Sequence, residues 1–164
     1  LIKKMSLKSS FLFALIAILI ISCDKQRVFD EYKPVGKSWE KDSIVTFNLP
    51  ELDSTKQYNL FINIRDNNDY PYNNLFLIAT LVAPNGFTQV DTLEYQMSDN
   101  EGNLLGEGLT DIKTSKLVYK ERVKFKPGKN TLQIKQAVRE TGKTKGVEKL
   151  EGITDVGFRI EKIE

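Results

Sequence analysis

The sequence predicts an all-β protein, a single antiparallel, jelly-roll-like β-sandwich domain behind an N-terminal lipoprotein signal peptide. Three observations predict this fold class. From Ser43 onward, apolar and polar residues alternate with a period of two, which is typical of half-buried strands. Turn-forming residues such as Pro50, Asn85-Gly86 and Pro127-Gly128 separate these segments. No segment has a convincing amphipathic helical period, so the strands are expected to pack sheet on sheet.

Residues 1–22 have the composition of a lipoprotein signal peptide. Three lysines and no acid precede an apolar run over residues 11–21, which is shorter than the roughly 20 residues that span a bilayer. Residues 20–23, Ile-Ile-Ser-Cys, match a bacterial lipobox. We therefore expect cleavage before Cys23, the only cysteine in the chain, followed by its acylation. The alternative is an ordinary signal peptide with a coincidental cysteine.

The predicted mature chain consists of a lipidated tether, residues 23–42, and a β-sandwich domain, residues 43–164. The tether is inferred from its polar composition and from Pro34 and Gly36, with an edge strand expected around residues 28–32. Cleavage removes three lysines and no acid, which changes the formal net charge from +2 to −1. The chain has no basic stripe, so no nucleic-acid partner is expected. The expected partner is the cell-envelope membrane, through the lipid on Cys23.

The first half of the domain is predicted to form four strands. Every second residue is apolar over 45–49 and 58–64, so each segment has one buried face. Residues 75–83 are apolar on both faces, as expected of a central strand. Asn85-Gly86 predicts a tight hairpin, because both residues tolerate a positive φ. The strand after this turn is expected to carry Phe87, Leu93, Tyr95 and Met97 on one face.

The second half is predicted to contain three strands and two loops. Residues 98–111 are rich in glycine and turn formers, which predicts a long loop. A helix is an alternative near residues 115–125, but alternating apolar residues favour a strand there. Its partner is expected over residues 132–138, followed by a charged loop at 140–149. The last strand is predicted from Val156, Phe158 and Ile160, which alternate with charged residues.

The chain contains no histidine, and its one cysteine is assigned to the lipid. These absences exclude Ser-His-Asp and Cys-His catalysis, histidine-ligated zinc and disulfides. An enzyme would depend on carboxylates, lysine or tyrosine. Glu94, Glu107 and Asp111 are candidates for a glycosidase pair, but such a pair needs carboxyl groups about 5 to 9 Å apart. No spacing in the sequence supports that arrangement, so we expect a non-enzymatic protein without a cofactor.

Three aromatic residues are candidates for contact with a glycan or a protein partner: Trp39, Tyr70 and Tyr72. A glycan binder should present them in one exposed row. The alternative is structural, with Trp39 capping the core and Tyr70-Pro71-Tyr72 covering the end of the sandwich. Residues 66–69 could offer oxygen ligands to calcium, but they lack the EF-hand spacing and are equally typical of a turn. We therefore expect no metal site.

Three segments, residues 58–77, 91–112 and 135–162, together resemble the gliding-motility lipoprotein family GldH of the Bacteroidota. The most specific parts are Tyr-Pro-Tyr-Asn-Asn-Leu at 70–75 and Gly-Ile-Thr-Asp-Val-Gly at 152–157. The resemblance implies an accessory lipoprotein that is required for gliding over surfaces. It also implies protein partners in the envelope machinery that serves type IX secretion, and no catalytic residues. The alternative function is a glycan-binding lipoprotein, and a carboxylate-based hydrolase ranks third.

The residues after Cys23 bear on membrane placement. Surface-exported lipoproteins of this phylum tend to carry acidic clusters soon after the cysteine. Here Asp24 is followed by Lys25-Gln26-Arg27, so the predicted anchor faces the periplasm. Between the two membranes, the outer membrane is favoured.

Overall fold

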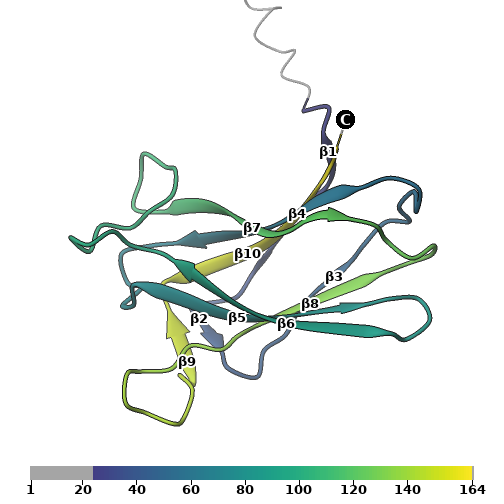
Figure 1. Cartoon of the computed structure of the whole chain (residues 1–164). Coiled ribbons are helices and arrows are strands. Elements are labelled where there is room, and N and C mark those ends of the chain that lie inside the picture. Colours follow the sequence, from purple (N-terminus) through teal and green to yellow (C-terminus); the bar gives the residue numbers. More distant parts are fainter. Residues whose placement is uncertain (1–23, 164) are drawn as a thin grey trace, which may run out of the picture.

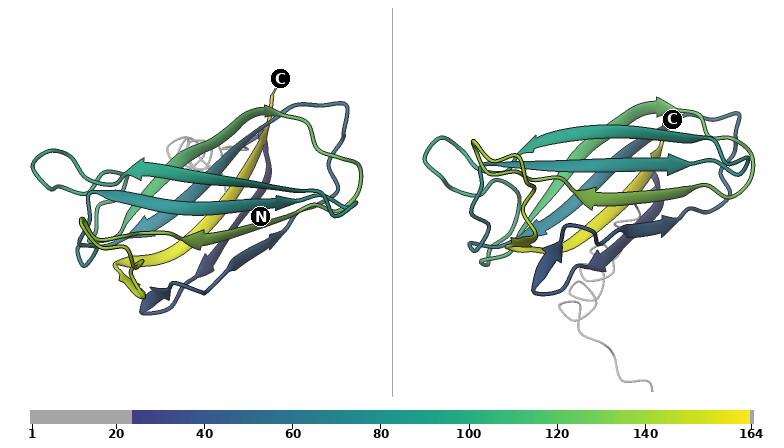
Figure 2. Two further views of the ribbon diagram at one scale, coloured as in Figure 1. Left: turned by 60° about the horizontal axis from the view of Figure 1, so that its bottom comes forward. Right: turned by 90° about the horizontal axis from the view of Figure 1, so that it is seen from below.

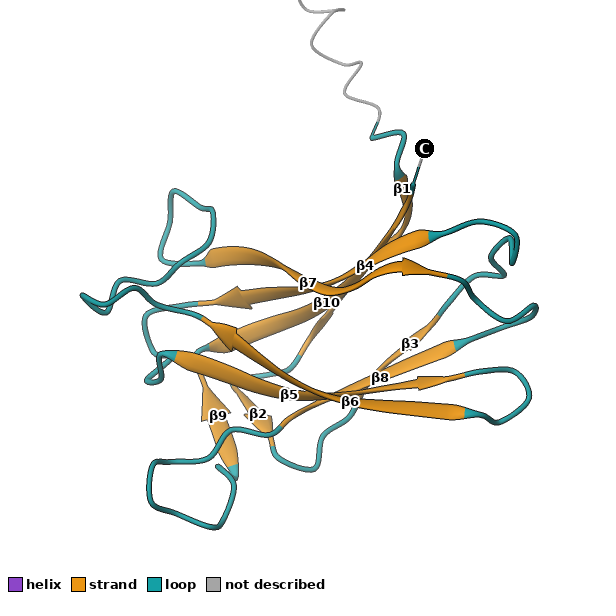
Figure 3. Ribbon diagram, viewed as in Figure 1, coloured by secondary structure: helices purple, strands orange, loops and turns teal. Residues whose placement is uncertain are grey.

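The computed structural model of the chain describes residues 24–163, so the predicted signal peptide and Cys23 lie outside the described residues. Within residues 24–163 every regular element is a strand, and no helix there could span a membrane (Figure 3). The ten strands are β1 (Arg27–Pro34), β2 (Ser38–Glu40), β3 (Val45–Asn48), β4 (Tyr58–Asp66), β5 (Asn74–Val82), β6 (Thr88–Gln96), β7 (Lys113–Val123), β8 (Thr131–Gln136), β9 (Lys149–Glu151) and β10 (Ile153–Lys162).

Eight of the strands form two stacked sheets (Figure 1). Sheet I has the order β1-β10-β4-β7 and sheet II has the order β3-β8-β5-β6, while β2 and β9 pair separately. All of these pairs are antiparallel. When the eight long strands are numbered consecutively, the orders become 1-8-3-6 and 2-7-4-5, which is the strand order of a jelly roll. The predicted all-β sandwich is therefore confirmed, and its topology is that of a jelly roll.

The core lies between the two sheets and follows from the period-two alternation. Leu60, Ile62 and Ile64 of β4 point inward from sheet I and are fully buried. Phe158 of β10 meets Phe47 of sheet II with ring centroids 6.0 Å apart. These contacts join the two sheets into one continuous apolar cluster.

The hairpin predicted at Asn85-Gly86 is present between β5 and β6. Gly86 has a φ of +81°, and the amide of Ala83 donates to the carbonyl of Phe87 over 2.8 Å. The pairing then continues without a register shift to the far ends of both strands. Phe87 precedes β6 in the turn and is 64% exposed, so the predicted strand begins one residue later than expected.

The edge strand expected around residues 28–32 is present as β1, at Arg27–Pro34. The segment assigned to the tether, residues 23–42, contributes β1 and β2, and β1 pairs with β10 along its whole length. Its polar composition is explained by its position, because β1 is an edge strand from which Phe29 packs against the core. Two strands of the fold therefore lie within the segment predicted as the tether. Only Asp24–Gln26 separate Cys23 from the first strand.

Candidate functional site

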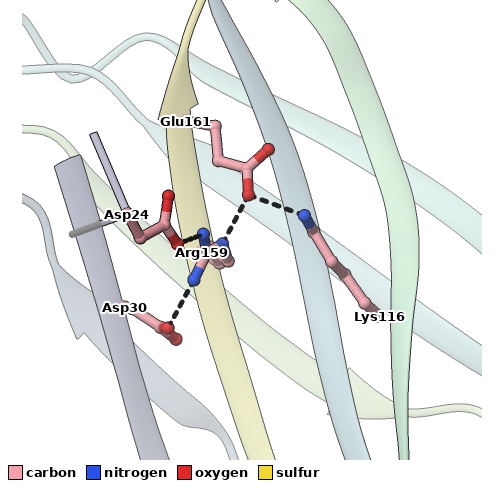
Figure 4. A network of polar contacts seen from close by, with 5 residues as sticks. All are labelled: Asp24, Asp30, Lys116, Arg159 and Glu161. Carbon is pink, nitrogen blue, oxygen red and sulfur yellow. Dashed lines mark hydrogen bonds and ion pairs between the residues drawn. The ribbon is translucent and has the colours of Figure 1, made fainter. Parts of the chain in front are cut away.

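The outer face of sheet I carries a network of charged side chains centred on Arg159 of β10 (Figure 4). Its guanidinium donates to Asp30 Oδ2 over 2.9 Å, to Glu161 Oε1 over 2.6 Å and also to Asp24. Lys116 Nζ binds the same Glu161 oxygen over 2.6 Å. We refer to these five residues, Asp24, Asp30, Lys116, Arg159 and Glu161, as the Arg159 network.

The register of sheet I positions this network. Phe158 and Ile160 point into the core, so Arg159 and Glu161 must point outward. Asp30 lies directly opposite Arg159 on the neighbouring strand, an arrangement in which opposite charges attract. The ammonium of Lys116 also lies 4.1 Å from the centre of the Phe61 ring.

The electrostatics of the network favour the charged form of every member whose pKa shifts. The hydrogen bond from Arg159 lowers the pKa of the Asp24 carboxyl. Partial burial opposes ionisation of Glu161, but hydrogen bonds from Lys116 and Arg159 lower its pKa overall. The pKa of Arg159 is raised despite its partial burial, because three acids accept its hydrogen bonds. The network therefore fixes Asp24 to sheet I as a set of ion pairs.

A groove of about 490 Å³ adjoins the network, and its lining includes Tyr32, Asn63, Lys116 and Arg159. Asn63 is only 3% exposed, and its Oδ1 has no hydrogen-bond partner within residues 24–163. Tyr32 packs over Gly157, where an added Cβ would lie 2.8 Å from the ring. The groove can accept a polar group, but both of its cations are already neutralised by acids.

The predicted aromatic residues do not form one exposed surface. Trp39 is fully buried in β2, where its indole nitrogen donates to the carbonyl of Ser43 over 3.0 Å. Tyr70 is 6% exposed and donates to the carbonyl of Asn74 over 2.9 Å. Tyr72 contacts Tyr70 edge to face, with ring centroids 5.9 Å apart. The structure thus brings the two tyrosines together as a cover of the sandwich, and the buried rings offer no face for a sugar to stack on.

Tyr72 also lines a second cavity, of about 430 Å³, at the end of sheet II. A neighbouring cavity of about 370 Å³ shares Val138 and Arg139 with it and is also lined by Lys135 and Lys145. These basic residues were not identified from the sequence, which indicated only a solvated charged loop. Their proximity depends on the bridge between Arg139 and Gly146, which folds the loop back on itself.

The acidic candidates lie on different elements of the described fold and make local contacts. No three acids, cysteines or histidines within residues 24–163 are arranged to hold a metal ion. Asn67 Oδ1 instead accepts the amide of Asp69 over 3.0 Å, as in an Asx turn. Glu94 is bound by Asn74 on sheet II, whereas Glu107 pairs with Thr114 of sheet I. These two carboxylates therefore do not face each other across one cleft.

Asp66 was singled out as a loop residue, but it occupies the last position of β4 and is fully buried. Neither of its carboxylate oxygens has a hydrogen-bond partner in the described part of the chain. Burial raises the pKa of this carboxyl to about 7. A sequence signal for its position exists, because residue 66 continues the inward series of residues 60, 62 and 64.

Comparison with known proteins identifies the family. The sequence model of the GldH lipoprotein family matches residues 27–160. The chain belongs to this family. It is 68% identical over 158 residues to the gliding motility lipoprotein GldH of Flavobacterium johnsoniae, covering 96% of this chain and 99% of that protein. A GldH homolog of Christiangramia forsetii is 56% identical, covering 94% of this chain and 95% of that protein.

Family membership makes the chain a gliding-motility lipoprotein associated with the cell envelope. Among solved structures, a family GH115 4-O-methyl-alpha-glucuronidase aligns with 88% of this chain at 14% identity and a TM-score of 0.45. The chain spans 19% of that enzyme. A likeness at this level carries no argument about function.

Proposed function

We propose that this chain is a non-enzymatic accessory component of the machinery for gliding and type IX secretion. It is held by acylated Cys23 in the outer membrane and faces the periplasm. The observation that carries the proposal is the 68% identity, over nearly the full length of both chains, to a gliding motility lipoprotein. The lack of histidine and the placement of Glu94 on β6 and of Glu107 in the loop before β7 support a role without catalysis.

Protein partners are favoured over glycans by the exposed side chains. Trp39 and Tyr70, which a sugar would need, are buried. Large apolar side chains are exposed elsewhere, including Phe87 at 64%, Val90 at 62% and Leu109 at 107%. Apolar contacts of this kind are typical of protein interfaces, in which aromatic and aliphatic anchors contribute most of the affinity.

The test is genetic complementation. A deletion strain would be supplied with the wild-type gene, a Cys23→Ser variant or a Ser22→Ala variant, which keeps a small residue before the cysteine. We expect the deletion to stop colony spreading, and both the wild type and Ser22→Ala to restore it. Cys23→Ser should fail although the protein is made. Normal spreading and a normal secreted-protein profile in the deletion strain would contradict the proposal.

The same strains test placement and secretion. Lipidated protein should fractionate with the outer membrane, and it should resist added protease in intact cells but not in lysed cells. Loss of secreted proteins in the deletion strain would support the link to type IX secretion. Cleavage of the protein in intact cells would show that it faces the outside.

A further inference from the structure

One end of sheet I lies next to the predicted lipidation site. The amide of Lys162 donates to the carbonyl of Gln26 over 2.8 Å, which places the end of β10 beside the start of the chain. Lys162 pairs with Tyr58, and Tyr58 pairs with Val123 at the end of β7. Because neighbouring strands lie about 4.8 Å apart, this row spans only about 15 Å from Gln26 to Val123.

Exposed cations gather on this row and on the turn that follows β7. They are Lys25, Arg27, Arg122, Lys124, Lys126, Lys129 and Lys162, which we call the basic end. None of these seven forms an ion pair with another residue of the described range 24–163. The acids nearby are Asp24 and Glu161, which are paired within the Arg159 network, Asp53, which is paired with Lys56, and the exposed Glu51 and Glu121.

The turn that carries three of the lysines is held in place. The Phe125 ring packs against Tyr58, with ring centroids 5.9 Å apart. Asn130 donates to the carbonyls of Lys126 and Gly128 over 3.1 Å each. Its own carbonyl accepts the amide of Leu49 over 2.9 Å. The basic end is therefore a defined surface of the fold.

The start of the chain is fixed to the same part of sheet I. Asp24, the residue after Cys23, is bound by Arg159, and its carbonyl accepts the amide of Arg27 over 3.3 Å. Pairing of β1 with β10 begins at Arg27 itself. A lipid on Cys23 would thus be joined to the domain without a flexible linker, close to the basic end.

We propose that the basic end binds anionic lipid headgroups of the membrane that holds the anchor. This inference rests on acylation of Cys23 in the proposed function. Each lysine or arginine close to an anionic surface contributes about 1 kcal/mol, and the attraction decays over a Debye length of about 8 Å. A lipid chain and a basic surface together form the combination that stabilises peripheral anchoring. The domain is then held against the membrane in one orientation, because the Arg159 network fixes Asp24, the residue after the anchor, to sheet I.

The test uses the mature chain with Cys23→Ser, which carries no lipid. All ten strands lie within residues 27–162, so the fold is retained without the anchor. Binding is measured by flotation with vesicles of phosphatidylcholine alone or mixed with phosphatidylglycerol. We expect binding to the anionic vesicles only, and release at high ionic strength.

Two triple variants provide the matched comparison. Lys124→Gln, Lys126→Gln and Lys129→Gln together should weaken binding about 100-fold, since each charge contributes about a fivefold factor. The control combines Lys135→Gln, Arg139→Gln and Lys145→Gln, which removes the same charge. These control residues lie on β8 and in the loop before β9, on the opposite side of the sandwich from the termini (Figure 1). The control should bind as the wild type does.

Hydrogen exchange locates the contact. Anionic vesicles should slow exchange at residues 122–130 and leave residues 137–148 unchanged. No binding to anionic vesicles, or equal loss in both triple variants, would overturn the inference. Because the protein in this assay is not acylated, the result is independent of whether the deletion strain glides. Failure of the proposed function and failure of this inference are therefore distinguishable.

Discussion

The outer faces of the two sheets share one core but differ in chemistry. On sheet I, outward residues such as Asp30, Lys116 and Arg159 bind one another in the Arg159 network. On sheet II, the outward residues near the centre of β5 and β6 are apolar or uncharged. They include Ile78 opposite Thr92 and Thr80 opposite Val90. Figure 2 shows the two sheets from two further sides.

The two faces differ in which outward side chains are bound within the chain and which remain available to another molecule. The charged groups of the Arg159 network are paired with one another, so this face contributes to the architecture and fixes Asp24. The centre of sheet II has little internal polar bonding, so its outward side chains remain available to solvent or to another molecule. Substitutions on the two faces should therefore have different consequences.

The largest effect is expected from Arg159→Leu on sheet I. The change removes the donor shared by Asp24, Asp30 and Glu161 and leaves three acids on one face. Hydrogen bonds to charged groups contribute about 1.5–3 kcal/mol, so we expect the free energy of unfolding to fall by about 2–3 kcal/mol. Urea denaturation of the mature Cys23→Ser chain measures it.

Lys135→Leu is the matched control on sheet II, because Lys135 is exposed and has no ion pair within the described residues. We expect the free energy of unfolding to change by less than about 0.5 kcal/mol.

The lowered pKa values of Asp24 and Glu161 set the pH range over which the Arg159 network stabilises the fold. The network stabilises the fold above the ordinary carboxyl pKa, and this contribution is lost as the pH falls through the lowered values. Equal losses for both variants at neutral pH would contradict the comparison.

Alternation and turn residues were sufficient to predict the sandwich, because burial depends on local periodicity. Residues 58–64 have the same inward face in the sequence and in the structure. The hairpin at Asn85-Gly86 was predictable for the same reason, since its φ requirement is local. The edge strand β1 was also expected, around residues 28–32, although edge strands bury one face and retain a polar composition.

The candidate site was not predictable, because it depends on register between distant strands. Asp30 and Arg159 are 129 residues apart, and only the pairing of β1 with β10 brings them together. Trp39 becomes buried through the pairing of β2 with β9, where it lies opposite Leu150. No local pattern in the sequence encodes either pairing. Prediction of strands is therefore easier than prediction of their partners.

The next prediction concerns Asp66, a buried acid of sheet I that lies outside the Arg159 network. Its pKa is raised from 3.8 to about 7, so between these values the folded state keeps a proton that the unfolded state releases. The free energy of unfolding should fall as the pH rises through this range and level off above it. Asp66→Asn should remove this dependence, so its stability relative to the wild type should rise from pH 4 to pH 7 and level off near pH 8.

The measurement is urea denaturation of both proteins across the same pH range. Asp69→Asn is the control, because Asp69 is exposed in the adjacent turn. It should leave the pH dependence of the wild type intact. If the free energies of unfolding of the wild type and of Asp66→Asn changed in parallel between pH 4 and 7, the assignment of a buried, unpartnered carboxyl would be contradicted.

A smaller effect is expected from Gly157→Ala on the outer face of sheet I. The new methyl group would lie 2.8 Å from Tyr32 and 3.1 Å from Asn63, so the tyrosine ring must move. Overpacking of this kind costs about 1 kcal/mol when the neighbour is a side chain at the surface. Thr80→Val, a nearly isosteric exchange on the outer face of sheet II, should cost less than about 0.5 kcal/mol. Thermal unfolding of the two variants compares the faces directly, and a larger loss for Thr80→Val would reverse the comparison.

The smallest effects come from adding one charge to each face. Val118 on sheet I and Val90 on sheet II are both on edge strands, 53% and 62% exposed. Val118→Lys places a cation two residues from Lys116 on the same face, so we expect a loss of about 0.5 kcal/mol that salt reduces. Val90→Lys meets Thr80 and no charge, so its effect should be near zero and independent of salt. Urea denaturation at low and high ionic strength separates them. A salt-sensitive loss for Val90→Lys would mean that charged groups also act on the outer face of sheet II. The proposed electrostatic difference between the two faces would then be wrong.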